Sequence, residues 1–195
     1  MALVFPCMGA SNQTCDRREL PLADGTKLDV RPMVRDDRDG FAALFERLGP
    51  ESRFHRYFSP KPALTSRELD YLSEVGHVGH VAFVAIDRSD ESIVGVARYV
   101  EHGNTEPTAE LAVEVADELQ RRGIGTALCE RVIDGARCNG FTRLTATALW
   151  ENDSARALMR RLGFHAVRSQ GREIEFELTL VPRTNSSNLE TERRL

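Results

Sequence analysis

The sequence predicts an α+β fold, in which a single domain has a central, mixed, mostly antiparallel twisted sheet flanked by helices. Three runs rich in β-branched residues, at 80–87, 93–101 and 108–116, follow one another through short polar connections, which is typical of an antiparallel meander. After them, helix-like and strand-like runs alternate, which favours a mixed sheet with helices packed against it. The length of 195 residues suits one such domain and is short for two.

The part of the chain before the meander supplies a hairpin and helices. Asp24-Gly25 is a two-residue hairpin signal inside the strand-like stretch 20–32. Residues 36–48 have the apolar spacing of a helix that ends near Gly49. Residues 51–60 are expected to form a second short helix or a loop, and residues 65–75 a helix with its N-cap at Thr65.

The part after the meander alternates between helix and strand. Residues 126–139 are predicted to form a helix that ends at Asn139-Gly140, and a strand follows at 143–149. A helix at 152–162 ends at Gly163, and strands at 164–170 and 172–180 form a final hairpin around Gly171. We expect residues 1–17 to be flexible, 18–181 to form the domain, and the polar residues 182–195 to be a disordered tail.

Composition and charge argue against several classes of function. The net charge of −4 lacks the basic surplus of a nucleic-acid binder, so no nucleic-acid partner is expected. No apolar run approaches the roughly 20 residues of a membrane span, and the start of the chain lacks the charged region of a secretory signal. We therefore expect a cytoplasmic protein. The four cysteines and five histidines show no metal-ligand spacing, so no metal is expected.

The most informative stretch is QRRGIG, residues 120–125, which lies between a predicted strand and a predicted helix. Gly123 and Gly125 let the backbone approach a ligand, and the N–H groups and dipole of a helix start favour an anion. Arg121 and Arg122 add positive charge, which indicates a phosphate or pyrophosphate site. A dinucleotide fingerprint is excluded because its third glycine would fall at Leu128. The alternative is that the glycines only tighten a turn.

Two glutamates precede this stretch on one strand. Alternation along residues 108–116 places Glu110, Ala112 and Glu114 on one face of the sheet, unless a β-bulge disturbs it. Two carboxylates on one face are costly to bury, so we expect that face to line a wet cleft. The sequence therefore predicts ionisable groups close to the anion site.

Two motifs together resemble the Gcn5-related N-acetyltransferase (GNAT) superfamily. QRRGIG matches its acetyl-CoA signature Q/R-x-x-G-x-G/A, and NDSA at 152–155 followed by LGF at 162–164 resembles its second cofactor motif. The similarity covers about residues 28–180. The stretches 24–32, 51–60 and 94–99 look like those of bacterial protein lysine acetyltransferases. The resemblance implies an acetyltransferase that uses acetyl-CoA as its cosubstrate.

The resemblance also implies roles for particular residues. Ala109-Glu110-Leu111 matches the stretch whose glutamate is the general base, so Glu110 is assigned that role, with Glu114 second and His102 third. The alternative for Glu110 is a pairing with an arginine. The cofactor-binding residues that the resemblance implies for the pantetheine arm and the pyrophosphate, through their backbones, are Val113, Glu114, Val115, Arg121, Arg122, Gly123, Ile124, Gly125 and Thr126.

Two residues of the second motif have competing interpretations. Asn152 would contact the pantetheine, but as a helix N-cap it also has a purely structural reason to be there. Arg161 would reach a cofactor phosphate, and the alternative is a solvated cation at a helix end.

One position departs from the superfamily pattern. Where many members carry a tyrosine that protonates the departing thiolate, this chain has Met159. A thiol with a pKa near 8.5 can leave as thiolate and take a proton from water, so the loss is tolerable. Tyr57 and Tyr99 remain possible donors. Trp150 is expected in the core, and residues 53–58 either shape the acceptor entrance or pack as an amphipathic helix.

These inferences converge on an N-acetyltransferase that moves acetyl from acetyl-CoA to an amine by direct attack in a ternary complex. A protein lysine ε-amino group is the favoured acceptor, and an AMP-forming acyl-CoA synthetase is the partner to test first. The alternatives are a small-molecule amine acetyltransferase and a non-catalytic module that senses acyl-CoA. The sequence does not decide the oligomeric state or the length of the acyl group.

Overall fold

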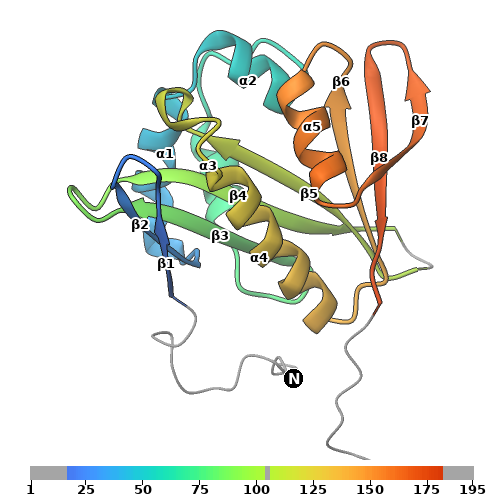
Figure 1. Cartoon of the computed structure of the whole chain (residues 1–195), viewed down its shortest axis with the longest axis horizontal. Helices are drawn as coiled ribbons and strands as arrows, with labels where there is room; N and C mark the ends of the chain where they lie inside the picture. Colours follow the sequence, from blue (N-terminus) through green and yellow to red (C-terminus); the bar gives the residue numbers. More distant parts are fainter. Residues whose placement is uncertain (1–16, 104–105, 182–195) are drawn as a thin grey trace, which may run out of the picture.

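The structure is a computed structural model, and it describes residues 17–103 and 106–181. In these residues one eight-stranded sheet has the strand order β1-β2-β3-β4-β5-β6-β8-β7 (Figure 1). All neighbouring strands are antiparallel except β5 and β6, which are parallel. The predicted α+β fold with a mixed, mostly antiparallel sheet is confirmed. The predictions for residues 1–16 and 182–195 lie outside the described residues.

The elements follow the predicted order closely. The strands are β1 (Arg18–Pro21), β2 (Lys27–Pro32), β3 (His80–Asp87), β4 (Ile93–His102), β5 (Thr108–Val115), β6 (Arg143–Leu149), β7 (His165–Gln170) and β8 (Glu173–Thr179). The helices are η1 (Arg35–Asp37), α1 (Arg38–Glu46), α2 (Pro50–Tyr57), α3 (Ser66–Ser73), η2 (Asp117–Leu119), α4 (Ile124–Cys138) and α5 (Asp153–Arg161), where η marks a 3-10 turn. For the stretch 51–60 either a short helix or a loop is expected, and its residues 51–57 form most of α2.

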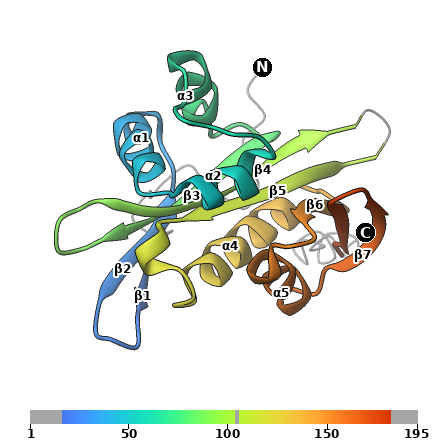
Figure 2. The ribbon, with the colours of Figure 1, turned by 90° about the horizontal axis from the view of Figure 1, so that it is seen from above.

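The helices cover both faces of the sheet. Helices α1, α2 and α3 lie on one face and α4 and α5 on the other (Figure 2). On the first face, Phe41 and Leu44 of α1 pack with Val84 and Val96 of the central strands. None of the helices in the described part of the chain is both long and apolar enough to span a membrane.

Helix α4 anchors the second and larger core. Its apolar residues recur every three or four positions, and Leu128, Val132 and Ala136 are fully buried against the sheet. Gly95 of β4 permits this close packing, because a Cβ there would lie 3.1 Å from Leu128 Cδ1. Loss of a buried leucine such as Leu128 costs about 2–5 kcal/mol of stability. The amphipathic pattern in the sequence thus fixes α4 against β4 and β5.

Strands β5 and β6 separate soon after they meet. They pair only from Thr108↔Arg143 to Glu110↔Thr145, whereas β6 pairs with β8 along its whole length. Figure 1 shows β5 and β6 diverging above this point. The start of α4 lies beside the gap, since a Cβ on Gly125 would lie 3.9 Å from the side chains of both Val113 and Val115. The sheet therefore contains an internal open edge next to a helix N-terminus.

Candidate active site

The loop before α4 has the backbone geometry of an anion site. Arg121 and Gly123 have φ angles of 62° and 90°, in the left-handed region that costs a non-glycine residue about 1 kcal/mol. The first turn of α4 has no side-chain cap and no acidic residue. The amides of Gly123 to Thr126 have no acceptor within the helix, and the helix dipole adds partial positive charge. This helix start can accept a phosphate or pyrophosphate without rearrangement.

The side chains of this loop are already engaged. Gln120 Nε2 donates to the Val115 carbonyl at 3.1 Å and to Asp117 Oδ1 at 2.9 Å, which ties the loop to the end of β5. Arg122 forms an ion pair with Asp24 in the β1–β2 turn. Gln120 thus has a structural role, and the Arg122 guanidinium would have to leave Asp24 to meet a ligand.

The open edge of β5 presents a particular set of peptide groups. Ala116 N donates to the Val94 carbonyl at 2.9 Å, so the even-numbered residues of β5 form hydrogen-bonded pairs with β4. The peptide groups of Leu111, Val113 and Val115 consequently point toward the gap. The peptide groups of Glu114 point toward β4, so the register does not favour the expected hydrogen bonds from the Glu114 backbone to the pantetheine arm. A linear ligand with amide groups could add to this edge as a short strand.

Glu110 lies at the point where β5 and β6 separate. Its side chain is exposed on the α1–α3 face, and Glu110↔Thr145 is the last pair between the two strands. Within the described residues it makes no hydrogen bond or ion pair, so the alternative of an arginine partner is not seen. His102 lies nearby, with its Nε2 2.8 Å from Thr145 Oγ1.

Glu114 has a different environment on the same face. The β4–β5 register runs without a bulge from Gly95↔Val115 to His102↔Thr108, so the predicted alternation holds. The Glu114 side chain is only 3% exposed and lies 3.9 Å from Arg56 Nε. The Tyr57 hydroxyl donates to it at 3.4 Å. Burial raises the pKa of Tyr57 well above its ordinary value, so this hydroxyl stays protonated.

A buried arginine completes this cluster. Arg98 of β4 is 2% exposed, and its Nη1 donates to the Leu72 carbonyl at the end of α3. Burial lowers the pKa of Arg98 to about 10, and the nearby Glu114 charge opposes that shift. The sequence analysis missed Arg98, although a charged residue within the apolar run 93–100 was a signal. Glu114 is thus held by cationic and phenolic neighbours, whereas Glu110 is exposed and without them.

Tyr57 and Tyr99 are the two tyrosines that could donate a proton to the departing thiolate. Tyr99 lies on the opposite face, where it packs against Phe141 at 5.1 Å and donates to the Val78 carbonyl at 3.0 Å. It is therefore excluded as a donor near Glu110. Tyr57 is on the face of Glu110, but its hydroxyl proton is directed at Glu114.

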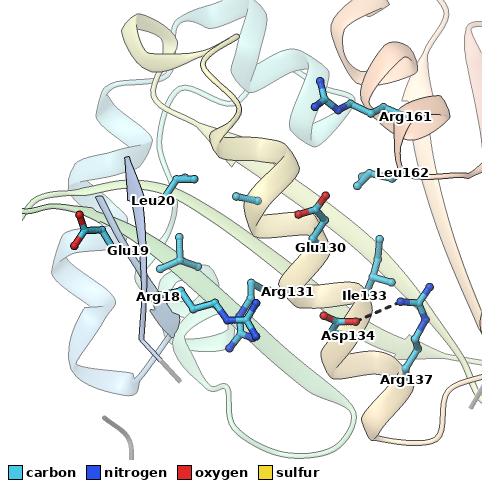
Figure 3. Close-up of a pocket in the computed structure, with 12 residues that line it drawn as sticks. Arg18, Glu19, Leu20, Glu130, Arg131, Ile133, Asp134, Arg137, Arg161 and Leu162 are labelled. Carbon is cyan, nitrogen blue, oxygen red and sulfur yellow. Dashed lines mark hydrogen bonds and ion pairs between the residues drawn. The ribbon is translucent and has the colours of Figure 1, made fainter. Parts of the chain in front are cut away.

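The second motif gives one structural role and one surface cation. Asn152 Oδ1 accepts from Ala155 N at 2.9 Å, which makes Asn152 the N-cap of α5. Arg161 is exposed and lines a groove of about 440 Å³ between β1 and α4 (Figure 3). This groove lies on the α4 face, opposite Glu110. Arg161 is thus on the side of the sheet where the α4 N-terminus lies.

The expectation for Trp150 was wrong. Its side chain is 60% exposed in the connection between β6 and α5, and the Arg156 guanidinium stacks on it at 4.3 Å. Trp150 thus lies at the surface after the end of β6, and Arg156 of α5 covers only part of its ring. Cys129 of α4 is fully buried in the core. In the described residues no group of His, Cys, Asp and Glu side chains has the arrangement of a metal site.

The fold is shared with solved acyltransferases. The GNAT domain of S. lividans PAT matches with a TM-score of 0.80 at 26% identity, covering 87% of this chain and all of that domain. A cAMP-binding acyltransferase from Mycobacterium smegmatis matches at 28% identity with a TM-score of 0.57, covering 85% of this chain and 48% of that one. The protein yncA from Salmonella typhimurium, solved with acetyl-CoA, shares the fold at 19% identity, with a TM-score of 0.66 over 81% of this chain and 96% of that one. Fold and site define the class of protein as an acyltransferase.

The family follows from the sequence comparison. The model of the acetyltransferase (GNAT) family matches residues 41–164, more than half of the chain, and the chain belongs to this family. It is 32% identical to Acetyltransferase PA5475 of Pseudomonas aeruginosa over 148 residues, which cover 73% of this chain and 77% of the relative. It is 33% identical to Acetyltransferase Pat of Mycolicibacterium smegmatis over 78% of this chain, and it spans 46% of that longer relative.

Proposed function

We propose that the protein transfers the acetyl group of acetyl-CoA to a lysine ε-amino group of another protein, by direct attack in a ternary complex. One observation carries the proposal: an exposed carboxylate, Glu110, lies where β5 and β6 part, at the inner end of an open strand edge that leads to the α4 N-terminus. The proposed base, Glu110, thus lies on β5 directly before the open strand edge that suits the thioester arm of the cofactor.

The residues present fit acetyl-CoA. The peptide groups of Val113 and Val115 would hold the pantetheine amides, because they face the gap and lack a strand partner there. The amides from Arg121 to Thr126 would hold the pyrophosphate at the uncapped start of α4. The Asn152 side-chain N–H groups and the Arg161 guanidinium would complete the site. This assignment is part of the proposal.

The reaction needs a base more than it needs an acid. A lysine ammonium has a pKa near 10.4, so Glu110 would take its proton before the amine attacks the thioester carbonyl. The C–N bond forms as the C–S bond breaks, and water takes the second proton that the nitrogen loses as it becomes an amide. The thiolate leaves with a pKa near 8.5 and takes its proton from water, since Met159 cannot donate one.

The resemblance to bacterial protein lysine acetyltransferases and the identity with Acetyltransferase Pat support a protein acceptor. We place the enzyme in the cytoplasm on the sequence alone, and an AMP-forming acyl-CoA synthetase is the acceptor to test first. The experiment incubates the protein with labelled acetyl-CoA and, in parallel, such a synthetase, free lysine and a polyamine. Label on a synthetase lysine, lost in the E110Q variant, supports the proposal.

The other outcomes each refute a part of it. Label confined to free lysine or polyamine would make the protein a small-molecule amine acetyltransferase. Tight acetyl-CoA binding by calorimetry with no transfer to any acceptor, including the proteins of a cytosolic lysate, would make it a sensing module.

A further inference from the structure

A second concavity lies on the face of the sheet that carries Glu110. It has a volume of about 470 Å³ and lies between the end of α3 and the ends of β3 and β4. Its walls include Tyr71 of α3, Glu74 and His77 after this helix, and Val100, Glu101 and His102 of β4. We call it the α3 pocket. Of its lining residues, only His102 has a role considered above, as the third candidate for the general base.

The α3 pocket adjoins the proposed base. Val100, which lines it, is the direct cross-strand partner of Glu110, and their side chains point to the same face. In a hydrogen-bonded antiparallel pair the Cα atoms are about 5.5 Å apart. His102, also in the wall, contacts Thr145, which is the partner of Glu110 on β6. A ligand seated beside Glu110 would therefore extend directly into the α3 pocket.

The lining favours a cation. It contains Glu74 and Glu101 and neither lysine nor arginine. Strand alternation directs the Glu101 side chain to the face of Tyr99, so the Glu74 carboxylate is the one on the Glu110 face. Neither carboxylate forms an ion pair within the part of the chain that the structure describes. Burial lowers the pKa of His80, another lining residue, to about 4, so His80 adds no positive charge near neutral pH.

The nearest guanidinium does not cancel this charge, and an aromatic wall is available. Arg98 is buried beneath the pocket, where it donates to the Leu72 carbonyl and has Glu114 as its counter-charge. Tyr71 is 53% exposed and forms part of the wall. An exposed aromatic ring can cover the methylene stem of a lysine or arginine and attract its cationic head.

We infer that the α3 pocket binds an arginine or lysine side chain of the acceptor protein that lies one or two residues from the acetylated lysine. Alternate side chains of an extended segment are about 6.6–6.8 Å apart, roughly 1 Å more than the Cα spacing between Glu110 and Val100. The inference rests on the proposed function, because it needs a polypeptide acceptor at Glu110. It deepens that function by stating which protein lysines are preferred.

The test compares three synthetic peptides with one central lysine, flanked on both sides by arginine, alanine or glutamate. We expect kcat/KM for the arginine peptide to exceed that for the alanine peptide roughly fivefold, mostly through KM, because a partly exposed ion pair contributes up to about 1 kcal/mol. Glu74→Gln should remove this preference and leave the alanine peptide and the KM for acetyl-CoA unchanged, whereas Glu101→Gln, whose side chain lies on the opposite face, should keep the preference. Glu91→Gln in the β3–β4 turn is the matched control and should behave as the unmodified protein.

A charge reversal makes the test independent of any loss of stability. Glu74→Lys should prefer the glutamate peptide over the arginine peptide. Equal rates for the three peptides, or a preference that survives both Glu74→Gln and the reversal, would overturn the inference while leaving the proposed function intact. Acetylation of spermidine but of no peptide would instead overturn the proposed function.

Discussion

Replacing Glu110 by glutamine tests the assignment of the general base. The Glu110 side chain is exposed and contacts no charged group within the described residues, and glutamine keeps its shape. The free energy of unfolding should therefore change by no more than about 0.5 kcal/mol. A loss of activity in E110Q can then be attributed to the chemistry and not to the fold.

The size of the loss follows from the ionisation of the acceptor. At about pH 7.4, an amine with a pKa near 10.4 is neutral in roughly one molecule in a thousand. Without a base, E110Q must use this neutral fraction, so kcat/KM for the acceptor should fall about 10²- to 10³-fold. The neutral fraction grows roughly tenfold per pH unit, so the deficit should shrink roughly 100-fold by about pH 9.4. This recovery is specific to the loss of a base.

The assay follows thiol release from acetyl-CoA across pH, with acetyl-CoA affinity measured by calorimetry. Glu114→Gln is the matched variant on the same strand face. Because Glu114 is buried beside Arg98, E114Q should lose about 1–3 kcal/mol of stability but keep the pH profile of the unmodified protein. Full activity of E110Q at about pH 7.4, or a deficit that does not shrink with pH, would refute the assignment. If the kcat/KM of E114Q instead falls at about pH 7.4 and recovers as the pH rises, Glu114 is the general base.

Three further outcomes are expected. Gly123→Ala and Gly140→Ala both replace left-handed glycines at the ends of α4, and each should lower stability by about 1 kcal/mol. Only G123A should weaken acetyl-CoA binding, as measured by calorimetry. Equal acetyl-CoA affinities of the two variants would argue against the anion site at the start of α4. Asp24→Asn releases Arg122 and should tighten acetyl-CoA binding up to about fivefold, and weaker binding would contradict this. Burial lowers the pKa of His80 to about 4, so below about pH 6.5 the unfolded chain takes up a proton that the folded protein refuses. Stability in urea should thus fall as pH decreases from about 6.5 to 4, less steeply in His80→Gln, and identical slopes would refute the prediction.

Local patterns in the sequence predicted most elements. The bounds of β3 and β6 agree with the predicted 80–87 and 143–149, and β3 lies in a run rich in β-branched residues between Gly79 and Arg88. The helix predicted from residue 126 begins earlier, at Ile124, whose side chain is buried. Gly123 and Gly125 have low helix propensity, and the packing of Ile124 in the core extends the helix past Gly125.

Pairing across the sheet decided what the local patterns could not. A β-bulge near Glu114 would disturb the alternation of side chains along β5, but the β4–β5 register is regular there. The regular register fixes which peptide groups of β5 face the gap. Trp150 was expected in the core, but its side chain is 60% exposed and stacks only with the Arg156 guanidinium of α5 among the aromatic and cationic contacts of the described residues. Such outcomes depend on residues far away in the chain.

The sequence alone determined the family, the helix start that suits an anion and the two acidic positions on β5, because these depend on residues close together in the chain. Only the tertiary structure decided how Glu110 and Glu114 differ. Arg56, Tyr57 and Arg98 come from other elements to surround Glu114, whereas the parting of β5 from β6 leaves Glu110 exposed. The environment of a carboxylate is set by what packs against it, and that is fixed by long-range pairing and not by its neighbours in sequence.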